Sequence, residues 1–153
     1  MRHRQKQIAS IVLNVTFPLA FAVAFLSAVY IRFYSGLLPA QDLPVWPAYI
    51  TYFAVSVALW SALEARAGLT HTCFEGTNLG RWLWSLAQID FVTLALVSSA
   101  AFFWRGYSFS RITVALFWTL HFLLCALAAG AARAWLRRRI GAAQGRSDRK
   151  SVV

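Results

Sequence analysis

Charged residues are scarce in this chain. Of its 153 residues, only 13% are charged and 59% are hydrophobic, and the mean hydropathy is +0.57. A water-soluble domain usually has about 25% charged and about 45–50% apolar residues. This deficit excludes an ordinary soluble domain and indicates that lipid is the solvent.

The groups that usually build catalytic and metal sites are also few. The chain has two cysteines, Cys73 in a predicted cytoplasmic connection and Cys125 in a predicted span, so we expect no structural disulfide. His71 and Cys73 form the run "HTC", but a zinc site needs about four ligands and no paired motif supplies the others. The sequence lacks a phosphate-cradling glycine loop, a catalytic triad and a carboxylate pair. We therefore predict neither a metal site nor catalytic residues in this segment.

Long apolar windows dominate what remains. A bilayer core of about 30 Å requires roughly 20 mostly apolar residues in a helix. The four windows of this kind cover about residues 8–33, 46–63, 83–104 and 112–135. They are too long and continuous for barrel strands of about ten residues, and unpaired backbone amides are costly in hydrocarbon. We predict an all-α, four-helix transmembrane bundle over residues 1–140.

The lysines and arginines divide unequally between the two sides of these spans. With the amino terminus inside, twelve of the fifteen are cytoplasmic, and the other three are Arg32, Arg105 and Arg111. Because basic residues flanking spans stay on the cytoplasmic side, we predict that both termini are cytoplasmic. The stretch "RGYSFSR", residues 105–111, is then a short external turn between the third and fourth spans.

A basic segment follows the fourth span. We predict that Arg137, Arg138 and Arg139 contact anionic lipid headgroups, each contributing about 1 kcal/mol. Nucleic-acid binding is disfavoured, because the arginines adjoin a membrane helix and no aromatic–basic module accompanies them. Residues 141–153 have the composition of a basic linker. Their last residues, "SVV", resemble the start of a strand in a following cytoplasmic domain, so we expect the chain to be part of a longer protein.

Two ionisable residues fall inside predicted spans, where such groups are rare and costly. Asp90 and His121 are possible intramembrane polar sites, and a proton or cation relay is one interpretation of them. The interpretation we favour is structural. Asp90, predicted near the cytoplasmic boundary, would reach headgroup water or pair with Arg81 or Arg133, and a neutral His121 would hydrogen-bond between helices.

The segment from Tyr107 to Arg139 resembles the amino-terminal membrane region of bacterial polyprenyl-phosphate glycosylphosphotransferases. The shared pattern is Phe109-Ser110-Arg111, then an apolar span with Phe117-Trp118, then Arg133 and a basic helix end. Ile31-Arg32-Phe33 at the end of the first span also fits, although the family commonly has a more basic connection where this chain has "CFEGTNLGRW".

This resemblance implies that the parent enzyme transfers a sugar 1-phosphate from a nucleotide sugar to undecaprenyl phosphate, using magnesium, for exopolysaccharide or O-antigen synthesis. Family catalytic residues lie in a carboxy-terminal domain, and none of those motifs occurs here, so no cofactor is implied for this segment. The implied role is to anchor the enzyme in the bacterial inner membrane and to form a homodimer.

Two other interpretations remain open. The membrane-bound nucleotide-sugar dehydratases and epimerases of polysaccharide biosynthesis share the four-span layout, although "FSR" fits the transferases better. A small four-span transporter working as a dimer is the other, but it would need a deep acidic residue, and we predict that Asp90 is shallow.

Overall fold

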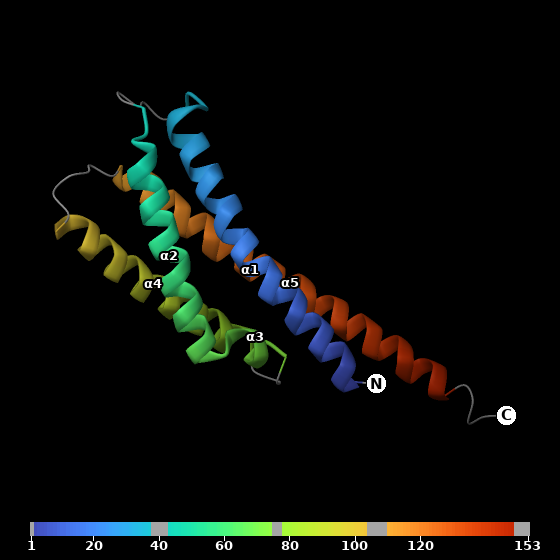
Figure 1. Ribbon diagram of the computed structural model, residues 1–153. Helices are drawn as coiled ribbons and strands as arrows, with labels where there is room; N and C mark the ends of the chain where they lie inside the picture. Colours follow the sequence, from blue (N-terminus) through green and yellow to red (C-terminus); the bar gives the residue numbers. More distant parts are fainter. Residues whose placement is uncertain (1, 38–42, 75–77, 104–109, 149–153) are drawn as a thin grey trace.

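The computed structural model describes residues 2–37, 43–74, 78–103 and 110–148 (Figure 1). Within these ranges the chain is helical, with four long helices and one short one. They are α1 (Arg2–Phe33), α2 (Trp46–Ala67), α3 (Leu69–Thr72), α4 (Leu79–Phe103) and α5 (Arg111–Asp148). The all-α prediction is confirmed.

Four of the helices are long and apolar enough to cross a membrane, as the four windows predicted. The candidate spans are Ser10–Phe33, Trp46–Ala67, Leu79–Phe103 and Arg111–Arg138. Figure 1 shows that α1 begins and α5 ends at the same end of the bundle. We call this the basic end, because it carries Arg66, Arg81 and Arg133. By length and composition the chain is a multi-pass membrane protein.

The carboxy-terminal ends of two helices differ from the sequence prediction. α2 continues to Ala67 and ends there because Gly68 adopts a left-handed φ of 62°, with its N–H donating to the Glu64 carbonyl at 2.8 Å. Only glycine adopts this conformation without a steric cost. α5 continues to Asp148, through residues 141–148 that we predicted as linker. This segment contains no proline, and its alanines, glutamine and arginine favour helix, whereas Gly141 and Gly145 do not.

Small residues line the closest helix pair. α1 packs most extensively against α5, and α2 packs mainly against α4. Ala20, Ala24 and Ala28 recur every fourth residue on the buried face of α1, and Ala129 is buried on α5. Without large side chains at these positions, two helix backbones can approach closely, and this supplies much of the packing in lipid.

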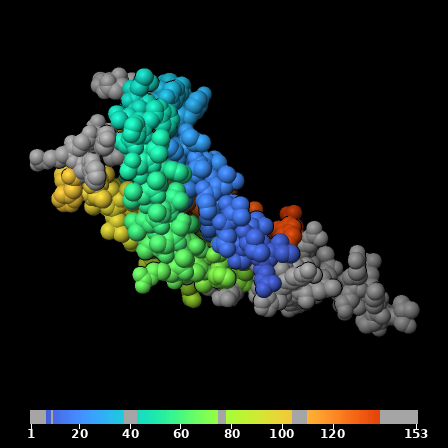
Figure 2. Space-filling view, in the orientation of Figure 1, coloured from blue at the N-terminus to red at the C-terminus, as the bar shows by residue number. Residues whose placement is uncertain are grey.

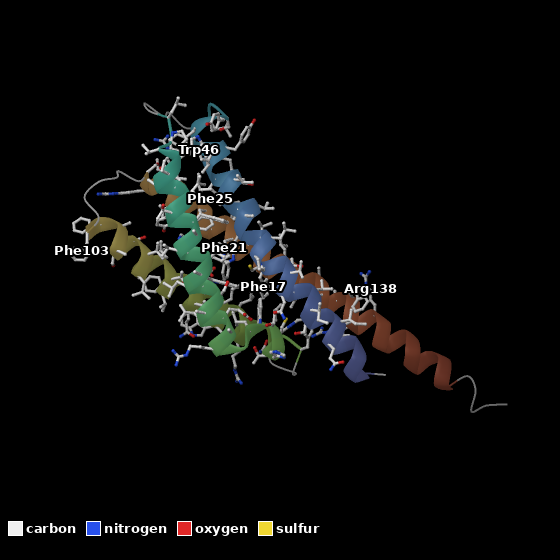
Figure 3. The ribbon with its side chains drawn as sticks, in the orientation of Figure 1. Phe17, Phe21, Phe25, Trp46, Phe103 and Arg138 are labelled. Carbon is white, nitrogen blue, oxygen red and sulfur yellow. The ribbon has the colours of Figure 1, made fainter. Side chains whose placement is uncertain are left out.

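Aromatic rings fill the space between the helix pairs. Phe17, Phe21 and Phe25 of α1 point into the bundle (Figure 3). Phe21 meets Trp60 of α2 with ring centroids 5.3 Å apart, and Phe117 of α5 at 5.6 Å. Such edge-to-face contacts stabilise the core beyond the area that they bury.

The outer surface of the bundle is apolar. Figure 2 shows one face of the bundle, where α2 lies along α1. Phe102 and Phe103 at the end of α4 are each 82% exposed, and Phe91 and Leu127 are also largely exposed. A water-soluble monomer rarely exposes a continuous surface of this kind. This surface matches a bilayer environment.

Candidate functional site: a polar cluster inside the bundle

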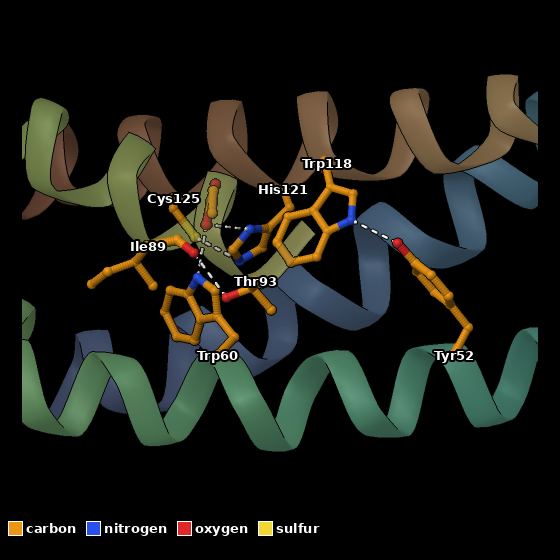
Figure 4. A network of polar contacts seen from close by, with 8 residues as sticks. Tyr52, Trp60, Ile89, Thr93, Trp118, His121 and Cys125 are labelled. Carbon is orange, nitrogen blue, oxygen red and sulfur yellow. Dashed lines mark hydrogen bonds and ion pairs between the residues drawn. The ribbon is translucent and has the colours of Figure 1, made fainter. Parts of the chain in front are cut away.

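Three spans bring polar side chains together inside the bundle (Figure 4). Asp90 belongs to a buried stripe on α4 that also includes Leu86, Thr93 and Val97. Residues spaced by three or four positions share one helix face, so the packing that buries the apolar members buries Asp90 as well. Asp90 is 7% exposed and His121 of α5 is fully buried.

Short contacts connect these residues. The Trp60 indole Nε1–H donates to Asp90 Oδ1 at 2.7 Å, and His121 Nδ1 lies 3.4 Å from the same oxygen. On the other side of the ring, His121 Nε2 lies 3.2 Å from Cys125 Sγ. We call Trp60, Asp90, His121 and Cys125 the central polar cluster. It links α2, α4 and α5.

The cluster is not fully satisfied. Asp90 Oδ2 and His121 Nδ1 are buried without a hydrogen-bond partner. The 3.4 Å contact between His121 Nδ1 and Asp90 Oδ1 is therefore a close polar contact, not an aligned hydrogen bond. A buried carboxylate is costly unless it is paired, and an imidazolium would provide the opposite charge.

Aromatic rings enclose His121. The Phe21 ring centroid lies 4.0 Å from that of the imidazole, and the rings of Trp60 and Trp118 meet it edge to face at 5.2 and 5.9 Å. Aromatic rings attract a cation through their negative faces. The enclosure also keeps the imidazole away from water, because His121 has no exposed surface.

A second polar chain lies further from the basic end. The Trp118 indole N–H donates to the Tyr52 hydroxyl at 3.2 Å, and that hydroxyl lies 3.5 Å from Ser98 Oγ. These contacts link the same three spans as the central polar cluster. Interhelical polar contacts of this type contribute about 0.6–2 kcal/mol each in membranes. Many of the polar side chains inside the spans therefore hold helices together through contacts with one another.

The structure places Asp90 differently from our prediction. We expected it near the membrane boundary, beside Arg81 or Arg133, but its contacts come from Trp60 and His121. Because α4 begins at Leu79 rather than near Leu83, Asp90 lies close to the middle of the helix. His121 lies in a helix interface, with contacts to α1, α2 and α4.

Sequence reasoning missed two members of this site. The sequence analysis does not single out Trp60, and it considers Cys125 only as a disulfide partner or a zinc ligand. The spacing held a usable signal, because Trp118, His121 and Cys125 follow one another by three and four positions and so share a face of α5.

The motif residue Ser110 caps α5. Its Oγ accepts from the Thr113 N–H at 3.4 Å and from Arg32 Nε at 3.2 Å, while its own N–H donates to the Tyr49 hydroxyl at 3.0 Å. We call Arg32, Tyr49 and Ser110 the capping junction, which joins α1, α2 and α5 at the end opposite the basic end. Arg111 is exposed, and Phe109 lies outside the described residues.

Arg133 lies against the ring of Trp82 at 5.9 Å, and its Nε and Nη2 atoms are buried without a hydrogen-bond partner. Beside it, burial raises the pKa of the Cys73 thiol, and Arg133 offsets part of that rise.

Arg137 and Arg138 are exposed, as contact with headgroups requires. The side chain of Arg139 lies outside the described residues.

Among the described residues, no group of three or more His, Cys, Asp or Glu side chains is arranged to hold a metal ion. Comparison with protein-family models, curated proteins and solved structures finds no match to this chain. The class of protein therefore rests on the chain itself. It is an all-α protein with four candidate membrane spans and a polar cluster at the centre of three of them.

Proposed function

We propose that this chain is the membrane-anchoring, homodimerising amino-terminal region of a sugar-1-phosphate transferase. The parent enzyme would load undecaprenyl phosphate in the bacterial inner membrane during exopolysaccharide or O-antigen synthesis. The capping junction is the observation that supports this proposal most directly. The resemblance to the transferase family rests partly on Arg32 and partly on Ser110, 78 residues apart in sequence, and the Arg32 side chain donates to Ser110.

The distribution of charge supports the orientation predicted from the sequence, in which both termini are cytoplasmic. The basic end carries Arg66, Arg81 and Arg133, together with the exposed Arg137 and Arg138, whereas Arg32 and Arg111 lie at the other end. Under the positive-inside rule the basic end faces the cytoplasm. α5 would then lead toward the compartment that holds nucleotide sugars, where a following catalytic domain would bind them with magnesium.

The packed interior favours anchoring over transport. Aromatic rings enclose His121, and three spans contribute polar groups that contact one another. A transport site needs access to water from each side in turn, whereas this arrangement fixes the helices relative to one another. We expect the bundle to behave as a rigid anchor.

The test uses membranes that contain either the 153-residue chain or the protein encoded by the whole reading frame. Each preparation receives a labelled nucleotide sugar, undecaprenyl phosphate and magnesium, and transfer of label to lipid is measured. We expect transfer only with the longer protein, and loss of membrane retention when residues 1–140 are removed. Turnover by the 153-residue chain, or a reading frame that ends at Val153, would contradict the proposal.

One observation favours the transporter as a second candidate. Asp90 lies at the middle of α4 and pairs with a histidine, and intramembrane acidic residues often mark proton pathways. Proteoliposomes that contain a pH-sensitive dye would test this function. Proton flux that Asp90→Asn abolishes would support the transporter, and absence of flux at an imposed gradient would exclude it.

A further inference from the structure

A cleft opens between α2 and α4 toward the basic end of the bundle. It has a volume of about 470 Å³ and is lined by Leu63, Arg66 and Ala67 of α2 and by Ser85, Gln88, Ile89 and Val92 of α4. The spacing of three and four positions on each helix means that each contributes one continuous stripe. The cleft is separate from the central polar cluster, none of whose members lines it.

The lining changes character along the cleft. α2 and α4 are antiparallel, so Arg66 at the end of α2 and Ser85 near the start of α4 both lie toward the basic end (Figure 1). Leu63, Ile89 and Val92 lie deeper along the spans. The cleft is therefore positively charged at its entrance, which we call the mouth, and apolar further in, which we call the floor. This arrangement matches the anionic headgroup and the apolar acyl chains of a lipid.

The charge at the mouth lacks an acidic partner among the described residues. No carboxylate pairs with Arg66 there. Glu64, the nearest acidic residue in sequence, accepts hydrogen bonds from the Thr70 hydroxyl at 2.6 Å and from the Thr70 N–H at 3.2 Å. Asp90 is buried against Trp60 and His121. Arg66 is exposed in the last turn of α2, where its long side chain can extend to the headgroup region.

We propose that this cleft binds one anionic phospholipid. The phosphate of the headgroup pairs with Arg66, the neighbouring Ser85 and Gln88 provide polar contacts, and one acyl chain lies over Leu63, Ile89 and Val92. This proposal depends on the membrane-spanning assignment of α2 and α4 and not on the function of any following domain.

Binding is measured on the purified 153-residue chain by native mass spectrometry, with phosphatidylglycerol or phosphatidylcholine added to the micelles. We expect one retained phosphatidylglycerol per chain and little phosphatidylcholine. Arg66→Gln should weaken retention about five-fold, the effect of one basic side chain at the membrane surface. The matched control is Arg111→Gln, which removes an exposed arginine at the opposite end and should leave retention unchanged.

A second pair of variants tests the apolar floor without changing charge. Val92→Trp fills the cleft and should abolish retention, whereas Leu96→Trp, one turn further along α4 and outside the cleft, should not. Equal losses in Arg66→Gln and Arg111→Gln, or equal retention of both lipids, would overturn the proposal. Complete displacement by glycerol phosphate would show a phosphate site without an acyl contact and would also overturn it. A change of oligomeric mass in Val92→Trp would assign the cleft to a second copy of the chain instead.

Discussion

The central polar cluster and the capping junction each join three helices, but they lie in different surroundings. Asp90 and His121 are buried between spans, where no water can replace a lost partner. Ser110 and Arg32 are only partly buried at one end of the bundle, where water can replace the lost partner. The same kind of hydrogen bond should therefore contribute more to stability in the cluster than in the junction.

The largest effect should follow removal of the Asp90 carboxylate. Asp90→Leu removes the acceptor of the Trp60 indole N–H and the carboxylate that lies 3.4 Å from His121 Nδ1. We expect the free energy of unfolding to fall by about 3 kcal/mol, in the range for breaking a buried pair. Unfolding in mixed dodecyl sulfate and maltoside micelles, followed by tryptophan fluorescence, measures this change.

Asp90→Asn is the matched control for that substitution. Asparagine has nearly the same volume as aspartate and keeps an oxygen that can accept the hydrogen bond from Trp60. Asp90→Asn should therefore lower the free energy of unfolding less than half as much as Asp90→Leu. An equal loss for both would mean that the charge, and not the hydrogen bond to Trp60, carries the stability.

A smaller effect should appear as coupling between Asp90 and His121. In a double-mutant cycle with Asp90→Asn and His121→Asn, we expect the two losses to differ from additivity by about 1 kcal/mol, because the two side chains are in direct contact. Thermal unfolding of the single and double variants in micelles supplies the four values. Additive losses would mean that the 3.4 Å contact contributes no stability.

Changes at the capping junction should have an effect no larger than that coupling energy. Ser110→Ala removes both the N-cap of α5 and the acceptor of Arg32, and we expect a loss of about 1 kcal/mol. Arg111→Ala changes the neighbouring motif residue, which is exposed, and should change stability by less than about 0.5 kcal/mol. If Arg111→Ala had the larger effect in the same unfolding assay, the capping role of Ser110 would be wrong.

The smallest effect concerns Cys73, which lies outside the spans. Burial raises the pKa of its thiol, and since the thiolate is the reactive form, maleimide labelling should be slow at pH 7. In a Cys125→Ser background, the labelling rate of the folded protein should level off at a higher pH than that of the unfolded chain. The unfolded chain should level off near the ordinary thiol pKa of about 8.5. Coincident profiles would contradict this placement of Cys73.

The same pKa shift sets the sign of a stability effect. The folded state holds the Cys73 proton more tightly than the unfolded chain does, so stability is unaffected below the unfolded pKa. It should decrease as the pH rises above that value.

The spans were predictable because a span depends on the mean hydropathy over about 20 residues, and four segments of the chain have a high mean hydropathy. Helix rotation was not predictable in this way. The spans are apolar on all sides, so the sequence pattern gave little indication of which face of α4 is buried. The pairing of Asp90 with Trp60 depends on that rotation, and on the start of α4 at Leu79.

The Ser110 cap shows how far local sequence can be interpreted. A serine just before an apolar run predicts a helix start, and α5 does begin at Arg111. Its partners Arg32 and Tyr49 lie 78 and 61 residues away in sequence. A single sequence contains no signal that relates residues so far apart, because their contact arises only after the spans have packed.

The length of α5 has a mechanical consequence. Its 38 residues extend about 57 Å at 1.5 Å per residue, while the hydrocarbon core is about 30 Å thick. One unbroken rod therefore runs from the Ser110 cap, past His121, to a point well clear of the acyl chains. Because side chains of α1, α2 and α4 pack around His121, the direction of this rod is fixed where it passes through the bundle, and its end near Asp148 is held at a set height above the bilayer.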